Sequence, residues 1–479
     1  MGVRRDGEAY DAVVVGSGPN GLAAAVELAR NGRSVVVLEA EDTVGGSTRS
    51  AELTLPGFIH DVGSAIHPLG YASPFFSTLP LERHGLEWVH PPAPLAHPFD
   101  DGTAAVLERS VGETGETLGP DARAYRGLMG PIACDFARII DSLLGPPRLP
   151  RHPFALARFG ARALRSARSL AEGLFEGEKA RGLFAGNAAH SFLPMEQTPS
   201  AAFGLVLSAV GHASGWPFPK GGSQKIADAL VSYLRSLGGE VYAGVRVCSV
   251  EEVPRTRVVL FDVTPRQLLG ISGHRFTERY RRALARYRYG PGVFKVDFAL
   301  DGPIPWRAEG CSRAGTVHLG GTLDEISAGE AAVSRGGHPE RPFVLLAQQS
   351  LFDGTRAPSG KHTVWAYCHV PNGSTVDMGE RIERQIERFA PGFRERILAK
   401  SEMGPADLQR INANHVGGDI NGGLQDLGQL FTRPVARLTP YSTPAGGLYI
   451  CSSSTPPGGG VHGMCGYFAA RAALASTLH

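Results

Sequence analysis

The chain has 479 residues, with 48 Lys and Arg residues against 46 Asp and Glu residues, so its net charge is close to zero. This balance excludes a protein that coats nucleic acid, and a hydrophobic fraction of 42% excludes a disordered chain. Glycine is unusually frequent at 62 residues and follows no collagen-like repeat, which indicates tight turns and close backbone contacts.

The first predicted unit is a strand, a helix and a second strand. A β-branched run over residues 11–15 precedes a glycine cluster, a small-residue helix over 22–30 and a buried strand over 34–38. In the cluster, Gly16, Gly18 and Gly21 allow backbone amides to approach a pyrophosphate. Glu39 ends the second strand and is placed to accept hydrogen bonds from both ribose hydroxyls. The unit therefore predicts a dinucleotide site that disfavours NADP.

Residues 101–215 show a helical pattern with a proline-rich break at 145–150. One stretch within it carries six arginines and no acidic residue: Arg148, Arg151, Arg158, Arg162, Arg165 and Arg168. Apolar residues interleave with these arginines, which is typical of a helix that lies on anionic lipid. A solvated basic helix with a core stripe is the alternative.

A new unit begins at residues 220–223, with a predicted helix over 224–236 and strands over 240–247 and 258–261. Alternating apolar and polar runs between residues 293 and 370 predict an antiparallel sheet, and a helix is expected over 378–389. The chain finishes with a strand over 448–450, a glycine loop and a helix from about residue 464. These elements predict an α/β protein that is α+β overall.

No stretch of 18 apolar residues is present, so no membrane-spanning helix is expected. Residues 1–6 match neither a myristoylation nor a twin-arginine signal, and the six cysteines form no CxxC pair. We therefore expect a cytoplasmic protein, peripheral on a membrane if the basic stretch docks. No nucleic-acid partner is expected, and the sequence does not predict the oligomeric state.

A glycine doublet, Gly45-Gly46, follows Glu39. It distinguishes a flavin site from an NAD site, because FAD is extended and needs further backbone contacts beyond the first glycine turn. Residues 57–64, 219–222, 447–450 and 457–463 form four further blocks in a fixed order. With these blocks the sequence resembles the flavin-dependent phytoene desaturases and the wider amine-oxidase-like group. The resemblance implies non-covalently bound FAD.

The resemblance also implies how the chain is divided. A Rossmann-type FAD-binding domain would be built from residues 1–95, 217–290 and 436–479. A substrate domain would combine a helical cap over 96–216 with an antiparallel sheet over 291–435.

The resemblance places the cofactor along the glycine blocks, with adenine at the backbone of Val247 and the loop over 458–463 beside the flavin. Residues 61–67 would lie near the isoalloxazine ring. The expected cofactor-binding residues are Gly16, Gly18, Pro19, Asn20, Gly21, Glu39, Ala40, Gly45, Gly46, Ser47, Thr48, Gly63, Ser64, Val247, Ser453, Gly459, Gly460 and Val461.

Three features depart from the family pattern. The segment after Val247 is short, Ser47 replaces a frequent arginine and leaves Arg49 as a phosphate partner, and serines at 452–454 stand where relatives carry an acid. The short segment after Val247 should remove a flap that relatives have, without loss of cofactor binding. The third leaves the ribityl contacts to hydroxyls or backbone.

No metal-binding, P-loop or nucleophile-elbow motif appears, so the chemistry is expected to be that of the flavin, with no metal. His67 and His462 lie on blocks beside the cofactor and are the candidate catalytic residues, with a purely structural role as the alternative for each. The glycine-rich run over 414–423 either approaches the cofactor or substrate closely or forms an ordinary surface loop.

We expect an FAD-dependent oxidoreductase of the dehydrogenase or desaturase type, which removes hydride from an apolar substrate of the polyene or carotenoid kind, or isomerises or saturates it. A flavin amine oxidase is the rival enzyme and would need an aromatic cage. The non-enzymatic rival is a flavin-retaining interaction protein. No second GxGxxG follows a strand, so oxygen, a quinone or a protein is expected to take the electrons.

Overall fold

The computed structural model describes residues 9–478. Residues 1–6, which were compared above with targeting signals, lie outside this range. The predicted βαβ unit consists of β1 (Tyr10–Val15), α1 (Pro19–Arg30) and β2 (Val35–Leu38). α1 begins directly after the glycine turn, with a proline in its first turn whose fixed φ suits a helix start.

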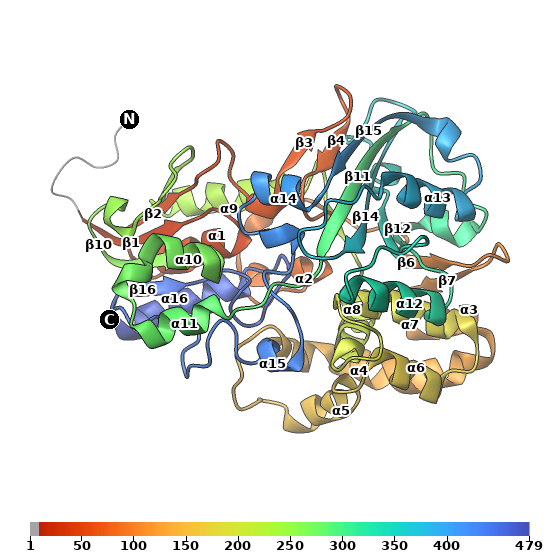
Figure 1. Cartoon of the computed structure of the whole chain (residues 1–479), viewed down its shortest axis with the longest axis horizontal. Helices are drawn as coiled ribbons and strands as arrows, with labels where there is room; N and C mark the ends of the chain where they lie inside the picture. The colour runs from red at the N-terminus through yellow and green to blue at the C-terminus, as the bar shows by residue number, and fades with distance from the viewer. Residues whose placement is uncertain (1–8, 479) are drawn as a thin grey trace.

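Five parallel strands form the first sheet, in the order β16-β10-β1-β2-β9 (Figure 1). The strands that join the βαβ unit come from distant segments: β9 (Glu240–Tyr242), β10 (Thr256–Phe261) and β16 (Leu448–Ile450). Helices cover both faces, as the continuous apolar strands require. One face packs against α1, α9 (Gln224–Ser236) and α16 (Met464–Ser476). The other packs against α10 (Pro265–Ser272) and α11 (Glu278–Ala285).

The second sheet has seven strands in the order β15-β11-β14-β13-β12-β6-β7, antiparallel except where β6 pairs with β12. Its strands are β6 (Ala93–Pro98), β7 (Ala104–Leu107), β11 (Gly292–Leu300), β12 (Ala314–Leu319), β13 (Val344–Ala347), β14 (His362–Val370) and β15 (Ile397–Met403). Two small ribbons join β3 (Ser50–Glu52) to β4 (Ile59–Asp61) and β5 (Trp88–Val89) to β8 (Phe218–Pro219).

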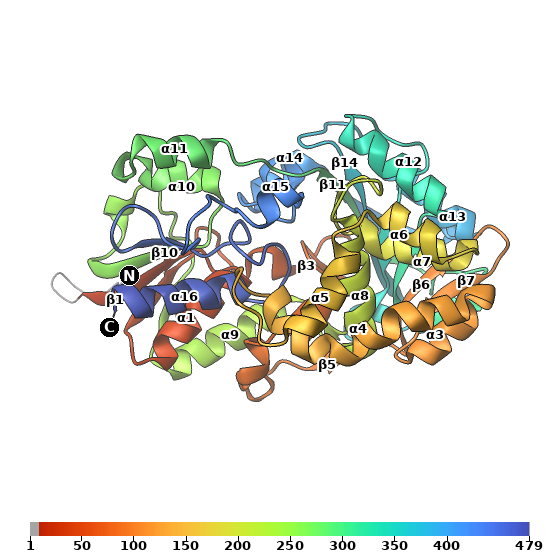
Figure 2. The same cartoon turned by 90° about the horizontal axis from the view of Figure 1, so that it is seen from below.

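A helical layer packs on one face of this sheet and α13 (Gly379–Phe389) on the other (Figure 2). The layer comprises α3 (Val111–Thr117), α4 (Ala122–Leu143), α5 (Pro153–Ala163), α6 (Ala167–Leu174), α7 (Glu178–Ala189) and α8 (Ser200–Ser214). The remaining helices are α2 (Pro68–Tyr71), α12 (Leu323–Ser334), α14 (Pro405–Ile411) and α15 (Leu427–Leu430).

The structure confirms the predicted fold class and corrects two details. β6 crosses the predicted boundary between residues 95 and 96, because β6 and β7 form a hairpin that joins the seven-stranded sheet instead of opening the cap. The cap helices therefore begin at α3. The strand predicted over 240–247 ends at Tyr242, because Gly244 adopts a left-handed φ of 71° that turns the chain out of the sheet.

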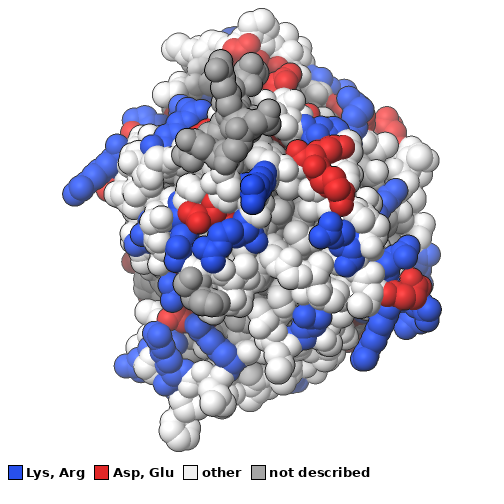
Figure 3. Space-filling model, turned by 90° about the vertical axis from the view of Figure 1, so that its left-hand side faces the viewer, with Lys and Arg blue, Asp and Glu red and all other residues white. Residues whose placement is uncertain are grey.

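Within residues 9–478, no helix has both the length and the apolar character needed to cross a bilayer. Figure 3 shows the face at the left-hand side of Figure 1, where basic side chains gather in several patches with acidic ones among them. This mixture matches the near-zero net charge.

Candidate active site

A narrow groove of about 150 Å³ runs along the carboxyl edge of the five-stranded sheet. The segments that follow β1, β2, β10 and β16 all line it, which is where parallel sheets bind nucleotides. Glu39 is 8% exposed, and one of its carboxylate oxygens accepts hydrogen bonds from the Ser17 amide at 2.8 Å and the Ser17 hydroxyl at 2.6 Å. The other accepts from the amide of Glu41 at 2.9 Å. The glycine turn and the acid therefore form one hydrogen-bonded unit.

A second buried carboxylate, Asp262, directly follows β10 and also lines the groove. One of its oxygens accepts a hydrogen bond from the amide of Gly21 at 2.9 Å. Burial raises the pKa of Asp262 to about 7, and the nearby charge of Glu39 acts in the same direction. Asp262 carries no sequence signal of this role, since only the parallel pairing of β1 with β10 brings it to the glycine turn.

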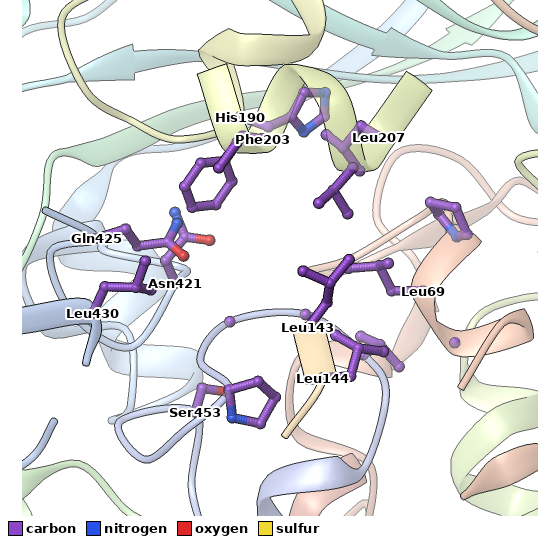
Figure 4. Close-up of a pocket in the computed structure, with 18 of the residues that line it drawn as sticks. Leu69, Leu143, Leu144, His190, Phe203, Leu207, Asn421, Gln425, Leu430 and Ser453 are labelled. Carbon is purple, nitrogen blue, oxygen red and sulfur yellow. The ribbon is translucent and has the colours of Figure 1, made fainter. Parts of the chain in front are cut away.

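A larger cavity of about 660 Å³ lies between the glycine loop at 456–461, the seven-stranded sheet and the cap helices (Figure 4). In Figure 4, Leu69, Leu143 and Leu144 face Asn421 and Gln425 across the cavity. The cavity and the groove share six lining residues: Pro19, Asn20, Ser47, His415, Ile420 and Ser453. The two spaces therefore adjoin each other along these residues.

The small residues along these adjoining spaces fit an extended dinucleotide. A Cβ atom at Gly18 would lie 2.6 Å from the carboxylate oxygen of Asp262 that binds the amide of Gly21, so a side chain there would displace Asp262 from the glycine turn. Where groove and cavity meet, the side-chain oxygen of Asn20 is buried without a hydrogen-bond partner among the described residues, while its nitrogen donates to Ser453 at 3.3 Å. An unpaired acceptor at this point suits the hydroxyls of a ribityl chain.

Most of the expected cofactor-binding residues line the groove or the cavity: Gly16, Gly18, Pro19, Asn20, Glu39, Ala40, Gly46, Ser47, Gly63, Ser64, Val247, Ser453, Gly459, Gly460 and Val461. Gly21, Gly45 and Thr48 do not line either space. They lie behind the wall, where the hydroxyl of Thr48 donates to the carbonyl of Gly45 at 2.8 Å. Their contribution is to the backbone that shapes the groove.

Arg49 lines the groove, but its guanidinium donates to the carbonyls of Gly46, at 3.0 Å, and of Ile411. Its hydrogen bonds to backbone oxygens hold it against the wall. Phosphate binding by Arg49, expected from the resemblance, stays a prediction.

The structure does not place His462 toward the substrate space. Its ring is fully buried outside the cavity lining, and its Nδ1 accepts a hydrogen bond from the amide of Met464 at 3.1 Å, in the first turn of α16. Its carbonyl accepts from the hydroxyl of Ser73 at 2.7 Å. Burial lowers the pKa of His462 to about 4, so the ring is neutral. The ring thus holds the loop against α16 instead of facing the substrate space, and a catalytic role for His462 stays a prediction.

His67 does line the cavity, and its Nε2 lies 2.7 Å from the hydroxyl of Ser223. Burial lowers its pKa to about 4, so it is neutral at physiological pH. Its Nδ1 has no hydrogen-bond partner within residues 9–478. A catalytic role for His67 stays a prediction.

The glycine-rich run over 414–423 approaches both spaces, with His415, Ile420 and Asn421 in their walls. This agrees with the cofactor interpretation of that run and not with an ordinary surface loop. Sequence analysis gave no sign of Trp365 and Tyr367, which enter the cavity wall from β14, because their strand pattern is that of any sheet core.

We predict that Asp262→Asn makes the protein more stable above neutral pH. Because the folded-state pKa of Asp262 is raised, wild-type stability falls as the pH rises from about 4 through about 7, and the variant lacks this loss. Urea unfolding at pH 5 and pH 8 measures it, with the exposed Asp42→Asn as control. The prediction would be contradicted if the free energies of unfolding of the wild type and of Asp262→Asn differed by the same amount at both pH values.

Comparisons with known proteins agree with this geometry. A family model for an NAD(P)-binding Rossmann-like domain matches residues 14–79. The chain is 27% identical to a rat (Rattus norvegicus) protein named pyridine nucleotide-disulfide oxidoreductase domain-containing protein 2, over 96% of this chain and 92% of that protein. It is 25% identical to phytoene dehydrogenase of Streptomyces griseus, over 81% and 78% of the two chains.

Among solved structures, putrescine oxidase bound to putrescine aligns with a TM-score of 0.62 at 19% identity, over 98% of this chain and 99% of the other. This likeness concerns the fold. With the sequence relatives it confirms the resemblance inferred from the glycine blocks. The chain is thus similar in sequence to phytoene dehydrogenase and to the rat oxidoreductase-domain protein, and it shares the fold of putrescine oxidase.

Proposed function

We propose that the protein is an FAD-dependent dehydrogenase, or a related isomerase or saturase, for an apolar substrate of the polyene kind. The observation that carries the proposal is that the nucleotide groove adjoins the large cavity along six shared lining residues. A dinucleotide that lies along the groove would end in the cavity wall, with its reactive ring facing the remaining space.

The lining of the cavity supports an apolar substrate. Leucine, isoleucine, valine, alanine, proline and aromatic residues form most of it, and no Asp or Glu of residues 9–478 contributes. Arg148 is the one Lys or Arg that lines the cavity within this range. Such a surface favours hydrocarbon, because burying a charged group without a partner is costly.

When bound, FAD would supply the hydride acceptor for the reaction. Gly459, Gly460 and Val461 would hold the ring side of the cofactor, while Glu39 would hold the ribose. The cap helices and β14 would exclude water and keep the reacting carbon close to the ring. No strong base faces the cavity, which suits removal of hydride beside a polyene.

The amine-oxidase alternative has weaker support from the site. Trp365 and Tyr367 do line the cavity, but their rings pack edge to face at 83°, with centroids 5.1 Å apart. They thus contact each other instead of facing across a gap, and no carboxylate in the lining would attract an ammonium group.

We predict that polyenes, and not amines, reduce the bound flavin. Mixing the purified protein anaerobically with phytoene in detergent should bleach the oxidised flavin absorbance, whereas putrescine and cyclohexylamine should leave it unchanged. Reduction by an amine alone would favour the oxidase. No reduction by any member of a polyene and amine panel would favour the flavin-retaining interaction protein.

We predict that Glu39→Ala raises the dissociation constant for FAD by roughly tenfold or more, because it removes charge-assisted hydrogen bonds worth about 1.5–3 kcal/mol each. Fluorescence titration of the deflavinated protein measures the constant. Asp42→Ala, a neighbouring exposed carboxylate, is the control and should bind as the wild type does. Equal FAD affinity in wild type and Glu39→Ala would show that Glu39 does not hold the ribose.

We also propose that the cavity opens toward a membrane surface. Leu164 and Phe431 line the cavity and are 55% and 56% exposed, so they lie at its mouth. Leu149, 95% exposed, and Phe154, 90% exposed, extend the apolar surface beside it. Exposed apolar side chains at the entrance suit a protein that draws its substrate from lipid.

The arginines of this region differ in whether they are paired with an acidic side chain. Arg158 pairs with Asp135 and Arg151 lies 3.7 Å from Asp141, both acids being on α4. Arg168 contacts three acids: Glu172, Glu196 and Asp324. Among the described residues, Arg148, Arg162 and Arg165 make no ion pair, so these three remain to attract anionic lipid.

We predict that Arg162→Glu combined with Arg165→Glu abolishes co-sedimentation with phosphatidylglycerol vesicles, and that wild-type binding falls with added salt. Arg279→Glu with Arg286→Glu is the matched control. It changes the net charge equally on and after α11, which lies away from α5 in both views (Figures 1 and 2). Vesicle binding that survives in the first variant, or is absent in the wild type, would contradict docking through this surface.

A further inference from the structure

The wall of the cavity opposite the cofactor loop contains a set of polar groups that the chemistry above does not use. Strand alternation places Thr316 and Trp365 in one row of the seven-stranded sheet, joined through Ala347. The next row on the same face runs from His318 through Leu345 to Tyr367. Thr316, Leu345, Trp365 and Tyr367 all line the cavity.

His190 covers these rows from the end of α7 and lines the cavity itself. Figure 4 shows its ring on the far side of the cavity from Ser453, which lies at the junction with the groove. Its Nε2 lies 3.0 Å from Nε2 of His318, and the edge of its ring meets Trp216 at a centroid distance of 5.7 Å. These contacts hold the imidazole in place.

The hydrogen-bond pattern indicates which nitrogen of His190 carries the proton. Nδ1 of His318 is buried without a partner in the described chain, and an orphaned lone pair costs less than an orphaned N–H. His318 therefore donates from Nε2 to Nε2 of His190. This leaves the proton of His190 on Nδ1, which has no hydrogen bond to residues 9–478 and is not among the sealed polar atoms.

Two more polar atoms of the same wall are unpartnered. The hydroxyl of Thr316 and the indole N–H of Trp365 are buried and make no hydrogen bond with the described residues. Both residues lie within the cavity lining, but these two atoms are sealed from the cavity itself. Of the three unused polar atoms, Nδ1 of His190 is therefore the one that a ligand in the cavity can reach, and a buried donor of this kind normally finds a partner.

We propose that this wall is a polar subsite that binds a neutral oxygen acceptor, a carbonyl or hydroxyl group, on an otherwise apolar substrate. The inference rests on the proposed function, because it assumes that an apolar substrate fills the cavity. His190 is the binding residue and donates from Nδ1. His318 is a positioning residue that fixes the tautomer of His190.

A neutral group fits the subsite better than a charged one. Burial lowers the pKa of His190 to about 3, with His369 acting in the same direction, so His190 supplies a dipole and no positive charge. Lys295 lies beside Trp365 but is paired with Asp297 on its own strand. The cationic side chain that does line the cavity, Arg148, belongs to the segment after α4 and not to the sheet wall.

Matched ligands test the subsite on the purified holoprotein. Tridecane and 2-tridecanone share an apolar chain and differ by one carbonyl, and both are titrated while the melting temperature and the flavin absorbance are followed. The ketone should bind about tenfold more tightly, since one hydrogen bond contributes up to about 1.5 kcal/mol. Tridecanoic acid should gain nothing over the ketone.

The variants separate binding from packing. His190→Leu should bring the ketone-to-alkane affinity ratio close to one, His190→Gln should keep part of the preference through its amide donor, and His318→Phe should lower the ratio by freeing the tautomer. Leu207→Met, another lining residue labelled in Figure 4, should change both affinities alike.

A wild-type ratio of one, or a ratio that His190→Leu leaves unchanged, would overturn the subsite while the apolar cavity stands. If the acid bound tenfold more tightly than the ketone, the proposal that the subsite binds a neutral acceptor would be overturned. If neither the alkane nor the ketone binds, the proposed function fails, and the subsite fails with it.

Discussion

The structure depends on one constraint: five parallel strands must end at the same edge of a sheet although they come from three distant parts of the chain. β1 and β2 supply the glycine turn and Glu39, β10 supplies Asp262, and β16 leads into the serines at 452–454. Backbone amides and carboxylates that are far apart in sequence thus face one groove. The larger cavity adjoins that groove along six shared lining residues.

Close backbone packing makes this convergence hold. A Cβ atom at Gly466 of α16 would lie 1.8 Å from the carbonyl oxygen of Asn20 on α1, so the last helix can approach the first only through a glycine. A Cβ at Gly21 would lie 2.1 Å from the carbonyl oxygen of Gly16. His462 stabilises the same junction from the loop before α16. These residues shape the cofactor space without touching it, which explains why Gly21 lies behind the wall.

The sequence allowed the βαβ unit, the second sheet and most of the groove to be predicted, because glycine spacing and strand periodicity are local signals. The sequence could not show in which direction an individual side chain points. His462 is on the cofactor loop as expected, yet its ring turns toward the amide of Met464. The same limit hid Asp262, His190 and the acids of α4 that pair with Arg151 and Arg158, since strand and helix packing alone bring them together. The β6–β12 pairing joins strands more than 200 residues apart, so no local signal could show that β6 belongs to the seven-stranded sheet.

The central claim is that the groove and the cavity together hold one extended flavin dinucleotide. Acid denaturation of the purified protein, followed by chromatography of the released cofactor, tests it most directly. The account predicts one equivalent of FAD per chain, released without a covalent link. Release of FMN or NADP, a flavin that stays attached to the denatured chain, or a protein that neither contains FAD nor binds it when it is added, would contradict the account.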